Sequence, residues 1–247
     1  MIGKVDKIIG YCVACLAAAL SVVSLYTAFF GTFETMTQRT MHLGIVSILA
    51  LFTYKLKSAQ TRPGLNLAVN TVLAVLIVAA NAYLLLNWKD LYISPFLDAT
   101  GLFMGVAAII ILLELTRRTV GMSLAIIVLL FLVYTYFGAY ISGFLGHRGY
   151  GVERIVVQVF AGTEGIYGIP IGVCATIVIV FLIFGSFLDR AGASNVLLNL
   201  ATSIAGRYRG GPAKVSIAAS GLMGMLSGSS AANAATTGAV TIPMMKK

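Results

Sequence analysis

The densest group of uncharged side chains able to bind an ion or a small solute lies near the C-terminus of the chain. It comprises Ser227, Gly228, Ser229, Ser230, Asn233, Thr236 and Thr237. Their hydroxyl and amide groups offer oxygen ligands to a cation, and none of them adds a fixed charge, which suits a site that must release its ligand. We therefore predict an ion- or substrate-binding site here, with a candidate sodium site at Ser227, Ser229 and Ser230 and no other metal.

The segment around these residues has the pattern of a broken membrane helix. Val215–Leu226 is apolar but too short to cross a bilayer at about 1.5 Å per residue. The break at Ser227–Ser230 and the exit through Pro243 to Lys246 predict a re-entrant helical hairpin whose two ends lie on one side. Unpaired carbonyls and N–H groups at such a break can bind cations and anions. The alternative is one long span, Val215–Met245, whose small residues serve helix packing.

The remaining chemistry-bearing residues give weaker signals. Glu164, within AGTEGIYG, is a candidate proton or cation group, and the alternative is a charge in a solvated loop. Cys12, Cys15 and Cys174 all lie in apolar runs. Cys12 and Cys15 form a C-x-x-C without His, acidic or basic groups close in sequence, so we interpret this pair as buried structural thiols, the alternative being a redox or metal pair. The sequence contains no nucleophile–base constellation and no phosphate-binding glycine loop, so we predict neither an enzyme nor a bound cofactor.

The composition identifies the environment that these residues need. Hydrophobic residues make up 59% of the 247 residues and charged residues only 10%, whereas soluble domains carry about 25% charged residues. The net charge of +9 resides in short basic clusters between apolar runs. In a membrane protein such clusters are topology signals, and no basic face or recognition motif indicates nucleic-acid binding.

We expect an all-α polytopic membrane protein with about six transmembrane helices followed by the hairpin. The spans are predicted at Ile8–Phe30, Met41–Leu56, Leu67–Asn87, Ala99–Leu115, Met122–Ile141 and Ile169–Leu188, with a short interfacial or re-entrant helix at Val152–Phe160.

The basic residues predict the orientation of these spans. With the N-terminus in the cytoplasm and a hairpin that returns to the cytoplasmic side, 13 of the 17 lysines and arginines fall inside. The four that fall outside are Arg39, Lys89, Arg148 and Arg154. This distribution follows the positive-inside rule.

Three motifs together carry a family resemblance. They are the hairpin region Gly206–Lys247, the sequence HRGYGVERIV at His147–Val156, and GTEGIYGIPIGV at Gly162–Val173. They resemble the large membrane subunit of tripartite ATP-independent periplasmic (TRAP) transporters, in the fused-permease branch associated with TAXI-type binding proteins. The resemblance covers residues 115–247.

The resemblance implies a division of labour along the chain. Residues 1–118 would correspond to the four-span small subunit, and residues 119–247 to the first part of the large permease domain. The family implies elevator-type import of an organic acid delivered by a periplasmic binding protein and driven by a sodium or proton gradient. The expected location is a bacterial or archaeal cytoplasmic membrane.

The length of the chain departs from the family pattern. Fused permeases continue well beyond Lys247 into a second hairpin that completes the binding sites. We therefore expect this chain to supply only part of a transporter. The alternative is a truncated, non-transporting membrane scaffold or assembly subunit.

Overall fold

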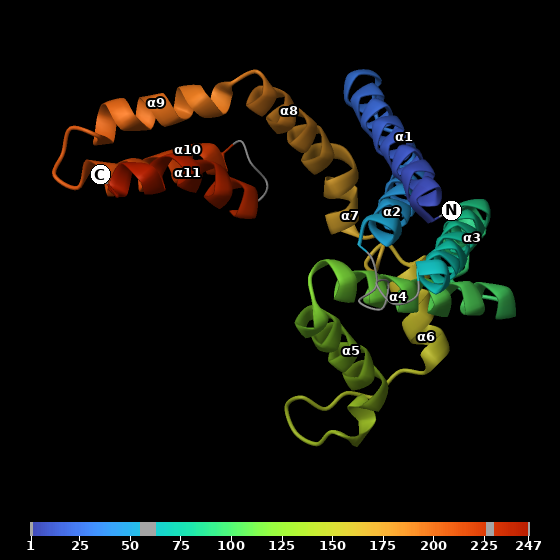
Figure 1. The fold of residues 1–247 in the computed structure, drawn as a ribbon. Helices are drawn as coiled ribbons and strands as arrows, with labels where there is room; N and C mark the ends of the chain where they lie inside the picture. The colour runs from blue at the N-terminus through green and yellow to red at the C-terminus, as the bar shows by residue number, and fades with distance from the viewer. Residues whose placement is uncertain (1, 55–62, 226–229, 247) are drawn as a thin grey trace. The chain divides into compact units, whose positions relative to one another are not determined.

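The computed structural model describes residues 2–54, 63–225 and 230–246, and within these ranges its regular structure is entirely helical (Figure 1). Five of its helical stretches are long and apolar enough to cross a membrane: Lys7–Phe30, Gly64–Ile93, Ala99–Thr119, Met122–Tyr140 and Ile169–Arg190. The all-α, polytopic membrane class predicted from the sequence is therefore confirmed.

Four helices supply the first four of these stretches. They are α1 (Ile2–Phe30), α3 (Pro63–Ile93), α4 (Ala99–Thr119) and α5 (Met122–Phe137), which the short helix η2 (Gly138–Tyr140) extends. The fifth stretch comprises α7 (Ile169–Val173), the π-helical turn η4 (Cys174–Val178) and α8 (Ile179–Arg190). The predicted segment at Val152–Phe160 forms α6 (Val152–Val156) and the π-helical turn η3 (Val157–Ala161).

The second predicted span differs from the observed helix. Helix α2 runs over Thr35–Thr53 and begins six residues before the expected Met41. Its first turns contain Gln38, Arg39 and His42, and α2 is not among the five apolar stretches. Arg39, expected among the outer loop charges, therefore lies on a helix.

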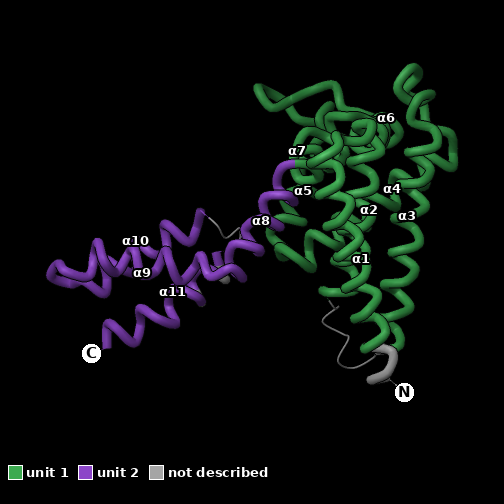
Figure 2. The backbone as a smooth tube through the Cα atoms, turned by 90° about the horizontal axis from the view of Figure 1, so that it is seen from above, with its two compact units in different colours: residues 1–176 green, residues 177–247 purple. Residues whose placement is uncertain are grey.

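The chain divides into two compact units, residues 1–176 and residues 177–247 (Figure 2). The resemblance predicts a different boundary, after residue 118, between a part related to the small subunit and a part related to the large subunit. In unit 1, residues on both sides of that position share one core: Leu84 and Ile111 pack in the same cluster as Val156, Phe160 and Tyr167. The ancestral boundary stays a prediction.

A buried polar contact ties the loop before α7 to α3. The Tyr167 hydroxyl donates to Oδ1 of Asn81 at 3.0 Å, and the amide of Asn81 donates to the Ile77 carbonyl at 2.7 Å. Burial raises the pKa of Tyr167, so this hydroxyl stays protonated and able to donate. The contact gives a hydrogen-bond partner to the Tyr167 hydroxyl and to the Asn81 side-chain oxygen, which would be costly to bury without one.

Unit 2 contains α8 and three further helices: α9 (Ala193–Ala205), α10 (Gly211–Gly224) and α11 (Ser230–Met245). Helix α9 was not predicted from the sequence. It packs along α10, where Ala201 and Ala205 meet Val215 and Ala219 in a small apolar cluster. Alanine pairs allow close approach of two helices.

Candidate functional site

Helices α10 and α11 form a packed pair over the segment where the sequence predicts a hairpin, and its re-entrant topology stays a prediction. They pack against each other in unit 2, with α9 along the other side of α10 (Figure 1). Hydrogen-bonding groups pair near the break and again farther from it, as expected for antiparallel neighbours: Asn233 with Ser220, and Thr241 with Ser216. Before α10, Gly210 has φ 70°, a left-handed conformation that glycine adopts freely, and Pro212 follows in the first turn.

Asn233 is the central polar residue of the hairpin. Its Nδ2 donates to the Ser220 carbonyl at 2.9 Å and lies 3.2 Å from Ser220 Oγ. Its Oδ1 is buried and has no hydrogen-bond partner among the described residues. A Cβ added at Gly224 would lie 3.5 Å from Asn233 Nδ2, an ordinary packing distance.

Two threonines extend the polar contact along α11. The Thr237 hydroxyl donates to the Asn233 carbonyl at 2.7 Å, and the Thr241 hydroxyl donates to the Thr237 carbonyl at 2.8 Å. Thr241 Oγ1 also lies 3.4 Å from Ser216 Oγ on α10. We call this set the polar seam: Ser216, Ser220, Asn233, Thr237 and Thr241.

The sequence interpretation identified only part of the polar seam. Asn233 and Thr237 were predicted, whereas Ser216, Ser220 and Thr241 were missed. The available signal was their four-residue spacing, 216 and 220 on one helix and 233, 237 and 241 on the other, because residues four apart share a helix face. Of the other predicted residues, Ser230 and Thr236 are exposed on α11.

Three predicted site residues, Ser227, Gly228 and Ser229, lie outside the described residues. Glu164 is exposed in the segment between η3 and α7 and belongs to unit 1, whereas the hairpin belongs to unit 2. The structure therefore assigns the predicted residues to two separate units.

The cysteines differ from the sequence interpretation. Cys12 and Cys15 are exposed on α1 and Cys174 is half-buried, so the prediction that Cys12 and Cys15 are buried is wrong. The lipid-facing length of α1 explains the difference, because an apolar run can meet lipid instead of protein. In the described part of the chain, no three His, Cys, Asp or Glu residues gather as a metal site would need.

The polar seam is rich in uncharged oxygen atoms that can act as ligands. It offers hydroxyls, a buried amide oxygen and helix carbonyls, and no ionised side chain. An unpaired buried acceptor costs about 1–3 kcal/mol, and a bound cation or a ligand donor would relieve that cost. The arrangement can therefore bind a weakly held cation or a polar solute.

Five described helical stretches of membrane-spanning length define a class, the multi-pass membrane proteins. Within that class, residues 107–247 match the family described as "Tripartite ATP-independent periplasmic transporter, DctM component". The match covers more than half of the chain, and the chain belongs to this TRAP transporter family.

Two relatives support the assignment. The chain is 38% identical over 65 residues to the "Putative TRAP transporter large permease protein" of Haemophilus influenzae, covering 26% of this chain and 16% of that protein. It is 28% identical over 142 residues to the "C4-dicarboxylate TRAP transporter large permease protein DctM" of Rhodobacter capsulatus, covering 57% of this chain and 28% of that protein. The chain thus spans less than a third of the length of either relative. No solved structure matches it.

Proposed function

We propose that this chain is the N-terminal portion of a fused TRAP permease that imports a small organic acid. Residues 1–118 act as the fused small subunit, and residues 119–247 open the large subunit. A periplasmic binding protein of the TAXI type delivers the substrate, and a sodium or proton gradient drives an elevator movement. The family match from residue 107 onward and the preceding apolar spans support this proposal.

The observation that carries the proposal is Oδ1 of Asn233, which is buried and has no hydrogen-bond partner in the part of the chain that the structure describes. Asn233 lies three residues after the start of α11. In the sequence it therefore follows closely on the predicted tip residues. We propose that this oxygen joins Ser227, Ser229 and Ser230 in a sodium site, while Gly228 permits the tight backbone turn. Thr236 and Thr237 extend the site, and Glu164 is a separate candidate proton or cation group.

The proposed location is a bacterial or archaeal cytoplasmic membrane with the N-terminus inside. This orientation follows the excess of basic residues in the cytoplasmic segments. The permease performs no covalent chemistry on its substrate in this proposal. The gradient supplies the free energy of transport.

The test replaces Asn233 in the complete permease. Asn233→Leu is close in size and removes the amide oxygen, so we expect the sodium concentration for half-maximal uptake to rise about tenfold, equivalent to about 1.4 kcal/mol. Asn199→Leu is the matched control, because Asn199 is exposed on α9. Uptake of the organic acid carried by the associated binding protein is measured against sodium at several pH values, with expression held equal.

A sodium dependence and a pH dependence that both stay unchanged in Asn233→Leu would contradict the site assignment. The hairpin residues would then serve packing. A loss of uptake at every sodium concentration is separated from misfolding by comparing thermal unfolding of the purified variant and control.

A further inference from the structure

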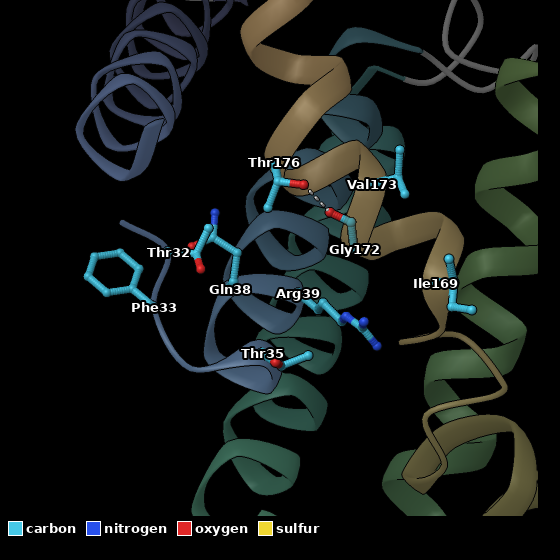
Figure 3. A pocket seen from close by; sticks show the side chains of 9 residues that line it. All are labelled: Thr32, Phe33, Thr35, Gln38, Arg39, Ile169, Gly172, Val173 and Thr176. Atoms are coloured by element: carbon cyan, nitrogen blue, oxygen red, sulfur yellow. Dashed lines mark hydrogen bonds between the residues drawn. The ribbon is translucent and has the colours of Figure 1, made fainter. Parts of the chain in front are cut away.

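A second polar feature lies in unit 1 and involves none of the hairpin residues. It is an open pocket of about 240 Å³ between the start of α2 and the helix that begins with α7 (Figure 3). Gly172 forms part of its wall, and its polar lining comes from Thr32, Thr35, Gln38, Arg39 and Thr176. The pocket is smaller than the roughly 300–1,000 Å³ of sites for drug-sized ligands, so it suits a small group.

Arg39 supplies the only positive charge among the residues lining this pocket. Its Nη1 donates to the Tyr167 carbonyl at 2.6 Å, and within the described ranges no carboxylate pairs with it. A guanidinium carries five N–H donors, so one carbonyl leaves most of them without a protein acceptor. An arginine that lines a pocket without a carboxylate partner is suited to bind an anionic group there.

Gly172 allows the guanidinium to lie against the helix backbone. A Cβ at this position would lie 2.9 Å from Arg39 Nε and 3.0 Å from Arg39 Nη2, closer than normal packing permits. The absence of a side chain at Gly172 thus holds space for the planar group, while the Tyr167 carbonyl fixes one of its edges.

Gln38 adds an independent sign of an incomplete site. Its side chain is 5% exposed, its Nε2 donates to the Ala175 carbonyl at 3.0 Å, and its Oε1 is buried without a partner within the described chain. Gln38 lines the pocket one residue before Arg39. The anionic oxygen of a ligand would accept from the Arg39 guanidinium. A donor group beside that oxygen could reach Gln38 Oε1 after a small movement of the glutamine side chain.

We propose that this pocket binds one oxyanion, either the carboxylate of a small organic acid or the phosphate of a lipid headgroup, through the guanidinium of Arg39. Arginine pairs with carboxylate and phosphate through two parallel hydrogen bonds, which gives both strength and orientation. Thr35 and Thr176 also line the pocket, and the Thr176 hydroxyl donates to the Gly172 carbonyl at 2.8 Å. The site is distinct from the hairpin and does not depend on the transport function proposed above.

The test measures protection of Arg39 in the purified chain, held in an uncharged detergent. Phenylglyoxal modifies arginines, and peptide mass spectrometry gives the rate at each one. Succinate is compared with neutral dimethyl succinate at constant ionic strength, and phosphatidylglycerol with diacylglycerol. Arg148 is the internal control, because it is exposed and stacks on Tyr150 with its Cζ 5.3 Å from the ring centre.

We expect one of the two anionic probes at saturation to lower the rate of Arg39 modification about tenfold, while Arg148 changes little. Protection by succinate assigns the site to a soluble acid, and protection by phosphatidylglycerol assigns it to a lipid. The proposal is overturned if neither anion protects Arg39 or if both arginines are slowed equally.

A second variant tests the geometry without removing the charge. Gly172→Ala places a methyl group against the guanidinium, so we expect the protection of Arg39 to fall. Gly10→Ala is the control, because its added Cβ meets nothing within 4 Å. Protection of Arg39 that is as strong in Gly172→Ala as in the unchanged chain would also overturn the proposal. The ligand would then not bind the Arg39 guanidinium in its position against Gly172.

Discussion

Arg118 links three helices at one end of the unit 1 bundle. Its Nε donates to Oε1 of Glu114 at 2.7 Å and its Nη1 to Oδ1 of Asn70 at 2.8 Å. Asn70 in turn donates to the Leu51 carbonyl at 2.8 Å. Arg117 pairs with the same carboxylate but lies farther out: the Arg117 side chain is 31% exposed and the Arg118 side chain 3%.

We predict that the two arginines differ sharply in their effect on stability. Arg118→Met leaves Asn70 Oδ1 without its donor and weakens a buried pair, so the free energy of unfolding should fall by about 3 kcal/mol. Arg117→Met should cost about 1 kcal/mol or less, since exposed pairs contribute little. Unfolding in mixed dodecyl maltoside and SDS micelles measures both, and equal losses would mean that burial does not govern this network.

Among the helices, the contact of α4 with the α6–η3 segment depends on a missing side chain. A Cβ at Gly105 would lie 3.1 Å from Phe160 Cδ1 and closer still to Val156 Cγ1. Gly105 is itself buried. Small residues of this kind let helix backbones approach closely inside membranes.

Gly105→Ala should therefore destabilise unit 1 by about 1–3 kcal/mol, the usual cost of overpacking a core. Gly10→Ala on α1 is the matched change in open space, and it should be neutral or stabilising by up to about 1 kcal/mol, because alanine favours the helix. Both values come from the same mixed-micelle unfolding curves. A Gly105→Ala protein as stable as the Gly10→Ala protein would show that α4 and η3 can move apart freely.

For the whole molecule, the hairpin makes a prediction about topology. Lys214 precedes most of α10 and Lys246 follows α11, so a re-entrant hairpin places both on the cytoplasmic side. In a chain with Cys12, Cys15 and Cys174 changed to serine, Lys214→Cys and Lys246→Cys should react with an impermeant maleimide only after cells are permeabilised. Arg148→Cys should react in intact cells. Labelling of Lys246→Cys in intact cells would mean that α10 and α11 together cross the membrane.

Helix α9 was missed and the start of α2 was misplaced for different reasons. Helix α9 buries Ala201 and Ala205 while Val196, Leu200 and Ile204 stay exposed, so its protein-facing side is less apolar than its outer side. That pattern is the reverse of a soluble amphipathic helix. The polar start of α2 resembled a loop because Gln38 and Arg39 find their partners on a distant segment.

The sequence by itself determined the membrane class, the approximate positions of the spans and the two halves of the hairpin. These features depend on local quantities: the length of an apolar run and the placement of glycine, proline and serine at its ends. Only the tertiary structure decided which polar groups meet. Asn233 and Ser220 are 13 residues apart and Arg39 and Tyr167 are 128 apart, and such pairs depend on helix packing that no local pattern encodes.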